Sequence, residues 1–140
     1  MRVVLTHSFT LDVLPAEALD LFTPEGERTW VSGWNPAYPA GEPSDTVGTI
    51  FQTEHNGHST IWAVVDHGVS AMRYARVTPG HTAGIVAVSC QAAETSGTQV
   101  EVTYDLTALS QRGRDFLAEF AAGYEAYLEG WAADIARSRA

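Results

Sequence analysis

The sequence predicts an α+β fold, in which an antiparallel sheet packs one face against a long C-terminal helix. Three observations support this class. From residue 48 to 106, apolar stretches recur at intervals of about 12 residues and alternate with short turns. Residues 111–137 repeat large apolar side chains at spacings of three and four, as one face of a helix does. Only short helical stretches precede the meander, so the C-terminal helix must cover the sheet.

The composition restricts the class of protein. The chain has 140 residues, of which 45% are hydrophobic and 18% charged, so we expect one globular domain over residues 1–140. Seventeen acidic residues oppose eight arginines, and the formal net charge of -9 argues against a nucleic-acid partner. The chain contains no lysine, which excludes Schiff-base and phosphate-loop lysines.

The sequence shows no sign of export or membrane insertion. The first residues, MRVVLTHSFT, lack the apolar core and the cleavage site of a signal peptide. No stretch reaches the ~18 apolar residues that span a bilayer. Cys90 is the single cysteine and has no partner for an internal disulfide. We therefore expect a cytoplasmic protein.

The N-terminal third contains one strand and two short helices. Residues 2–13 alternate apolar and polar side chains, as a half-buried strand does, and His7 falls on the apolar parity. Pro15 and Pro24 each suit the first turn of a short helix. Residues 35–48 contain three prolines and two glycines and are expected to form a loop.

Five strands are expected next, joined by tight turns. They span residues 48–55, 59–66, 70–77, 82–93 and 98–106. Asn56-Gly57 is typical of a type I′ hairpin turn, and Pro79-Gly80 of a type II turn. Short connections of this kind make neighbouring strands antiparallel.

The last two strands allow a register to be predicted. A hairpin closed at Glu94 and Thr98 pairs Cys90 with Val102 and Val88 with Tyr104. In this register one face is apolar and the other mostly polar. The sheet therefore has a single buried face.

The expected cover is one helix over residues 111–137. Its apolar stripe is rich in aromatic residues and consists of Phe116, Phe120, Tyr124, Tyr127, Leu128, Trp131 and Ile135. Such a stripe fits the wall of a cavity and equally fits an ordinary large core. The helix pattern alone leaves both interpretations open.

Nearly the whole chain resembles the START-related (SRPBCC) superfamily. The segments that carry the resemblance are PEGERTWVSGWNP (24–36), GTIFQTEHNGHSTIWAVVD (48–66), RYARVTPG (73–80) and GTQVEVTYDLTALSQRG (97–113). The chain looks like bacterial polyketide cyclase/dehydrase-like proteins, which share the helix-grip fold with the birch-pollen allergens. The resemblance implies about seven strands that curve around the long helix and enclose a cavity. A seventh strand would have to lie between residues 35 and 45.

Large side chains along this pattern are the candidates for contact with a ligand. The predicted ligand-binding residues are Trp30, Trp34, Phe51, Trp62, Tyr74, Arg76, Val88, Tyr104, Phe116, Phe120 and Tyr124. Each of them fits a filled core as well as a cavity wall. Phe51, Trp62 and Tyr74 face inward in only one of the two parities that the turns allow. We choose that parity because it groups the large rings on the apolar face.

Two polar residues are catalytic candidates. Arg76 shares a face with Tyr74, and a buried arginine needs an acidic partner, such as Glu54 or an anionic group of a ligand. The alternative is a strand-end arginine with its guanidinium in water. His7 is a candidate acid or base near neutral pH, and the alternative is a hydrogen-bonded interior histidine.

No metal or cofactor is expected. His55 and His58 flank an exposed hairpin turn beside Glu54, but two imidazoles there do not make a closed site. No nucleophile elbow, His-Glu-x-x-His motif, dinucleotide fingerprint or phosphate loop is present.

The expected function is therefore binding of a small hydrophobic or aromatic molecule in a cavity of roughly 300–1,000 Å³. One alternative is a cyclase, aromatase or dehydratase, with His7, Arg76, Tyr74 and Tyr104 as its candidate residues. Another is a protein-interaction module similar to the chaperone-activating branch of the superfamily, which would have a collapsed pocket. The expected partner is a small ligand, and the chain is expected to be a monomer or a homodimer.

Overall fold

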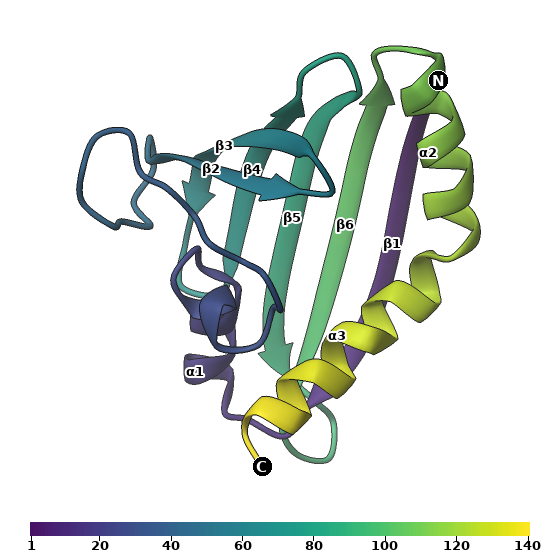
Figure 1. Ribbon diagram of the computed structural model, residues 1–140. Coiled ribbons are helices and arrows are strands. Elements are labelled where there is room, and N and C mark those ends of the chain that lie inside the picture. The colour runs from purple at the N-terminus through teal and green to yellow at the C-terminus, as the bar shows by residue number, and fades with distance from the viewer.

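The computed structural model describes residues 1–140 and contains one curved, six-stranded antiparallel sheet with helices on its concave side (Figure 1). The strands are β1 (Arg2–Leu11), β2 (Ile50–His55), β3 (His58–His67), β4 (Ala71–Thr78), β5 (Thr82–Ala92) and β6 (Thr98–Ala108). Their order across the sheet is β1-β6-β5-β4-β3-β2. The α+β class and the antiparallel meander are confirmed.

The short helices lie between β1 and β2. They are α1 (Pro15–Ala18) and the 3₁₀ helices η1 (Leu19–Phe22) and η2 (Gly26–Thr29). Pro15 occupies the first turn of α1, where its missing N–H costs no hydrogen bond. Both predicted short helices are present, but the second is a single 3₁₀ turn that begins at Gly26, so Pro24 precedes it.

The expected seventh strand is reduced to a single pair. Ala37 and Gln52 exchange two backbone hydrogen bonds of 2.9 Å beside β2. Pro36 and Pro39 flank Ala37, and proline has no N–H to donate to a ladder. Pairing therefore cannot extend, and the sheet has six strands rather than seven.

The register of β5 and β6 differs from the prediction by two residues. Cys90 pairs with Val100 and Val88 with Val102, instead of Val102 and Tyr104. The turn closes through a hydrogen bond from Ala93 N to Gly97 O. A shift of two residues keeps every side chain on its predicted face, and the apolar face is buried as expected.

The C-terminal segment forms two helices rather than one. They are α2 (Gln111–Ala122) and α3 (Tyr124–Ser138). Gly123, between them, leaves the helical conformation at φ -107 and ψ 12. Glycine is the weakest helix former after proline, so the chain bends there. In Figure 1, α2 runs beside β6 and β1, and α3 then crosses toward the short helices.

The core lies between the sheet and these two helices. Leu117 from α2, and Leu128 and Ile135 from α3, are at most 1% exposed. Tyr124 is also buried, and its hydroxyl donates a hydrogen bond to Val102 O on β6. None of the helices is long and apolar enough to cross a membrane.

Candidate functional site

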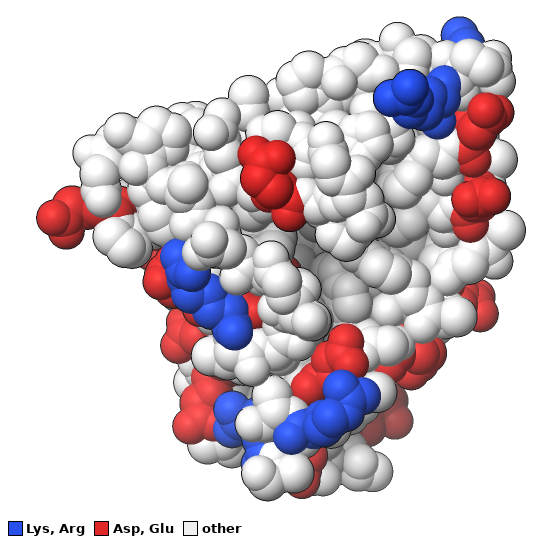
Figure 2. Space-filling view, in the orientation of Figure 1, with Lys and Arg blue, Asp and Glu red and all other residues white.

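A pocket of about 400 Å³ lies between the β2–β3 hairpin, residues 27–34 and α3. Figure 2 shows a hollow in the middle of this face, with acidic side chains above and below it. The aromatic residues that line it are Trp30, Trp34, Trp62, Tyr104, Tyr127 and Trp131. The charged residues are Glu27, Glu54, Arg76 and Asp134, and Val31, Ser32, Gly33, Thr53, His55 and Thr60 complete the wall. All four tryptophans of the chain contribute, so we call this the tryptophan pocket.

A narrow inner pocket of about 20 Å³ continues from it beneath the sheet. The lining residues of the inner pocket that are not shared with the tryptophan pocket are Phe22, Phe51, Tyr74, Val86 and Val88. This volume holds about one water molecule, so side chains fill most of the space between the centre of the sheet and the helices. The space for a ligand is therefore the tryptophan pocket.

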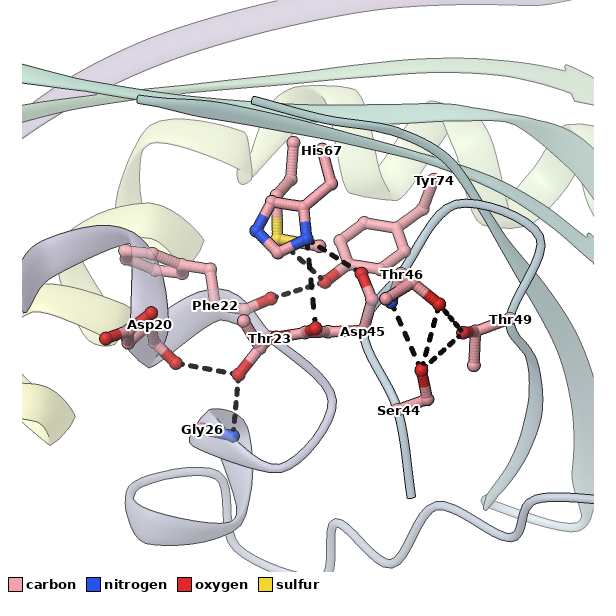
Figure 3. Close-up of polar contacts among 11 residues, drawn as sticks. Asp20, Phe22, Thr23, Gly26, Ser44, Asp45, Thr46, Thr49, His67 and Tyr74 are labelled. Carbon is pink, nitrogen blue, oxygen red and sulfur yellow. Dashed lines mark hydrogen bonds and ion pairs between the residues drawn. The ribbon is translucent and has the colours of Figure 1, made fainter. Parts of the chain in front are cut away.

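Residues 20–26 hold one wall of the pocket in place (Figure 3). The hydroxyl of Tyr74, on β4, donates to Phe22 O at 2.7 Å. Thr23 Oγ1 donates to Asp20 O at 2.8 Å and accepts a hydrogen bond from Gly26 N at 3.0 Å. A Cβ atom at Gly26 would overlap Asp20 O, so this turn requires glycine. These bonds fix the direction in which the chain enters η2, and they thereby position Glu27 and Trp30 at the pocket.

Hydrogen bonds at their ring nitrogens orient three of the four indoles. Trp30 Nε1 donates to Leu21 O at 2.8 Å, Trp34 Nε1 to Pro24 O at 2.8 Å, and Trp62 Nε1 to Thr53 Oγ1 at 2.9 Å. Their polar edges are thus satisfied within the protein.

The rings pack mainly edge to face. Trp34 meets Trp62 at 5.9 Å and 70°, and Trp131 meets Trp30 at 5.4 Å and 61° between ring planes. Phe51 stacks on Trp62 at 5.7 Å with parallel planes, on the inner side. Such a wall presents flat, apolar faces to a ligand.

Arg76 points inward, as the chosen parity predicts. Its guanidinium carbon lies 4.8 Å from the ring centre of Trp62, and Nη2 donates to Thr78 Oγ1 at 3.3 Å. Its Nε is buried and has no hydrogen-bond partner. Glu54 also lines the pocket, but the expected ion pair between the two does not form.

Glu27 is a site residue that the sequence does not reveal. It lies in η2 and lines both the tryptophan pocket and the inner pocket. An acidic residue in the first turn of a helix has a sufficient local reason to be there, because it opposes the helix dipole. Burial raises the pKa of the Glu27 carboxyl well above its usual range. Since the folded pKa lies above the unfolded one, folding stability falls as the pH rises between the two values.

The predicted ligand-binding residues divide into three groups. Trp30, Trp34, Trp62, Arg76 and Tyr104 line the tryptophan pocket, and Phe51, Tyr74 and Val88 line the inner one. Phe116, Phe120 and Tyr124 line neither of these two pockets. The inward direction of Phe51, Trp62 and Tyr74 agrees with the chosen parity, since all three are at most 9% exposed.

The three residues outside the pockets have other contacts. Phe116 is 37% exposed and packs against His81 and Phe120. Phe120 packs edge to face against Tyr104 at 5.2 Å. Tyr124 is buried as the stripe predicts, whereas Phe116 is exposed, and the cavity lies farther along the C-terminal segment, beside Tyr127 and Trp131 of α3.

His7 does not line either pocket. Its Nε2 lies 2.9 Å from Glu129 Oε1, so the side chain joins β1 to α3. The expectation that His7 lines the cavity is therefore wrong, because α3 packs over β1 and covers this position. His7 is hydrogen-bonded, as the alternative expects, but the pair lies at the surface rather than in the interior, since the two side chains are 22% and 60% exposed.

The phenols in the interior are poor bases. Burial raises the pKa of Tyr104 well above its usual range and also raises that of Tyr74. Both phenols therefore stay protonated at neutral pH, and no phenolate is available there to act as a base.

Comparison with solved structures identifies the fold. No protein-family model matches the chain, and no curated protein sequence matches it. Among solved structures, it is similar to an uncharacterized protein from Rhizobium leguminosarum, at 15% identity and a TM-score of 0.68, over 98% of this chain and 96% of that chain. CalU16 from Micromonospora echinospora is similar at 17% identity and a TM-score of 0.61, over 94% of this chain and 71% of that chain. Ara h 8.0201 is similar at 12% identity and a TM-score of 0.61, over 94% of this chain and 98% of that chain. These likenesses, together with the curved sheet and the C-terminal helices, show that the chain has the helix-grip fold.

Proposed function

We propose that the protein binds a small hydrophobic or aromatic molecule in the tryptophan pocket and that it is a member of the START-related superfamily. The observation that carries the proposal is a volume of about 400 Å³ walled by all four tryptophans. This volume falls in the usual range of small-molecule sites. Trp30 and Trp62 are at most 9% exposed and Trp34 and Trp131 are partly exposed, so the rings pack against the protein on one side and face the chamber on the other.

A fluorescence titration tests this proposal. N-phenyl-1-naphthylamine is neutral and apolar, and it accepts excitation energy from tryptophan. We expect saturable binding in the wild type and roughly fivefold weaker binding in Tyr127→Ala, which loses an aromatic contact worth on the order of 1 kcal/mol. Phe116→Ala is the matched control, since Tyr127 and Phe116 are 45% and 37% exposed and only Tyr127 lines the pocket.

The two variants separate a pocket from general surface binding. Phe116→Ala should bind the probe within about twofold of the wild type, because no contact to the pocket is lost. Equal weakening in both variants, or the absence of saturation in the wild type, would contradict the proposal.

An enzyme of the cyclase, aromatase or dehydratase type is the second candidate, and one observation favours it. Arg76 and Glu27 both line the pocket, so two groups of opposite type meet one cavity. A carboxyl with a raised pKa keeps its proton to higher pH and can act as an acid, and a guanidinium can stabilise an enolate. Glu27 takes the place of His7 in this candidate mechanism.

A chaperone-activator-like interaction module receives less support. That alternative predicts a collapsed pocket, whereas the tryptophan pocket is large enough for a small molecule. Ligand binding therefore accounts better for the space between the hairpin and α3.

A further inference from the structure

Glu27 is distinguished from the other acidic residues around it by having no partner. Glu25, two residues earlier, pairs with Arg28 at 3.0 Å, and Asp134 across the pocket pairs with Arg137 at 3.0 Å. Glu27 forms no ion pair and no side-chain hydrogen bond, although it is only partly exposed and surrounded by rings. Acidic groups in such surroundings are rare unless they are paired. Its carboxyl lines the open pocket and is not among the buried atoms that lack a partner, so it is free to pair with a group from outside the chain.

The aromatic surroundings favour a cation. The face of an indole ring carries negative potential and attracts ammonium groups, more strongly than phenol or benzene does. Four indoles and two phenols line the same chamber as Glu27. Arg76 already uses this property, because its guanidinium stacks on Trp62 within the pocket.

The charge balance points the same way. Glu27 and Glu54 line the chamber without an ion pair, against one arginine, Arg76, and the third acidic residue, Asp134, is paired with Arg137. The whole chain carries a formal net charge of -9, which raises the local concentration of cations. An anionic ligand would be repelled by the acidic residues of the pocket and by the net negative charge of the chain.

We propose that the ligand of the tryptophan pocket is an aromatic or alkyl amine whose ammonium group pairs with Glu27 and rests against the indole faces. This inference rests on the proposed function, because it specifies the chemistry of the same site. It assigns Glu27 as the residue that recognises the charge and the tryptophans as those that recognise the apolar part.

Arg76 is the feature that favours the opposite charge. Its Nε lacks a partner and would accept a carboxylate or phenolate. Its guanidinium already stacks on Trp62 and donates to Thr78 through Nη2, whereas the Glu27 carboxyl forms no hydrogen bond or ion pair within the chain. The anionic ligand is therefore the competing outcome of the test.

The pairing makes binding dependent on pH. The titratable and charged groups facing Glu27 across the two pockets are Glu54 and His55 on β2, Tyr74 and Arg76 on β4, Tyr104 on β6, and Tyr127 and Asp134 on α3. A cation pairs with the ionised carboxyl, so affinity should rise as the pH rises through the raised pKa of Glu27. Glu54 and His55 line the same pocket, so the test needs a variant that changes Glu27 alone.

The experiment measures displacement of N-phenyl-1-naphthylamine by three molecules of similar size. Benzyltrimethylammonium carries a charge that does not titrate, neopentylbenzene is its neutral isostere, and 3-phenylpropanoate is the anion. We expect the ammonium compound to bind at least about tenfold more tightly than the neutral isostere at pH 8. Glu27→Gln should remove most of this preference and most of its pH dependence, whereas Glu17→Gln, an exposed change of charge on α1, should leave both unchanged.

The outcomes separate the inference from the function on which it rests. Equal binding of the ammonium compound and its isostere, or tighter binding of 3-phenylpropanoate, would overturn the amine inference and leave ligand binding intact. A pH dependence that persists in Glu27→Gln would overturn the assignment of Glu27. Absence of binding by the naphthylamine and all three competitors would overturn the proposed function as well.

Discussion

Replacing Trp62 with alanine is expected to lower the free energy of unfolding by about 3–5 kcal/mol and to abolish ligand binding. The ring is 9% exposed and contacts Trp34, Phe51 and Tyr74, and Arg76 stacks on its face. Its loss would leave a cavity in the wall shared by the two pockets. Urea unfolding, followed by circular dichroism, measures the stability.

Two further variants make this prediction specific. Val65→Ala, on the same strand but 42% exposed, should cost less than about 1 kcal/mol. Trp62→Phe keeps a ring but loses the hydrogen bond to Thr53, so it should fold, lose about 1 kcal/mol and bind more weakly than the wild type. A Trp62→Ala protein as stable as Val65→Ala would show that this wall is not part of the core.

Replacing Gly113 with alanine should destabilise the protein by about 1–3 kcal/mol, whereas the same change at Gly130 should stabilise it by up to ~1 kcal/mol. A Cβ atom at Gly113 would overlap the backbone oxygen of His81, which accepts a hydrogen bond from Leu109 N at 2.8 Å. The first turn of α2 could then no longer approach the turn between β4 and β5. At Gly130, in α3, nothing lies within 4 Å of the added atom, so only helix propensity changes.

The opposite signs make the pair informative. Both changes are glycine to alanine within a helix, so the unfolded chain loses similar conformational freedom in each. Midpoints of thermal and urea unfolding give the comparison. Stabilisation by both variants would mean that α2 does not pack closely against the β4–β5 turn.

The alternation of apolar and polar side chains predicts which face of the sheet a residue lies on far better than it predicts which residue it pairs with on the next strand. Alternation allows two parities for Phe51, Trp62 and Tyr74, and the one that groups the large rings is the one that the structure has. The exact pairing of β5 with β6 depends on where the turn closes, and a slip of two residues keeps the same faces. The break at Gly123 and the single strand pair at Ala37 are each caused by one or two residues. A prediction from the periodicity of a long segment does not detect such local interruptions.

The site is harder to predict than the fold because its walls come from distant parts of the chain. Trp30, Trp62 and Tyr104 are candidates because large rings on an apolar face are visible in the sequence. Glu27 escapes notice because its burial is produced by rings such as Trp131, far along the chain, and not by its neighbours. His7 lies on the predicted face of β1, but α3 packs over that position, so the side chain contacts Glu129 instead of a cavity.

The location of the ligand is the central claim, and nuclear magnetic resonance tests it most directly. The four indole N–H groups give four separate signals, and all four rings line the tryptophan pocket. During titration with N-phenyl-1-naphthylamine, we predict saturable shifts of these signals, while the backbone amides of Glu101 and Thr103, in the middle of β6, stay unchanged. Unmoved indole signals, together with shifts centred on another face of the molecule, would contradict the account.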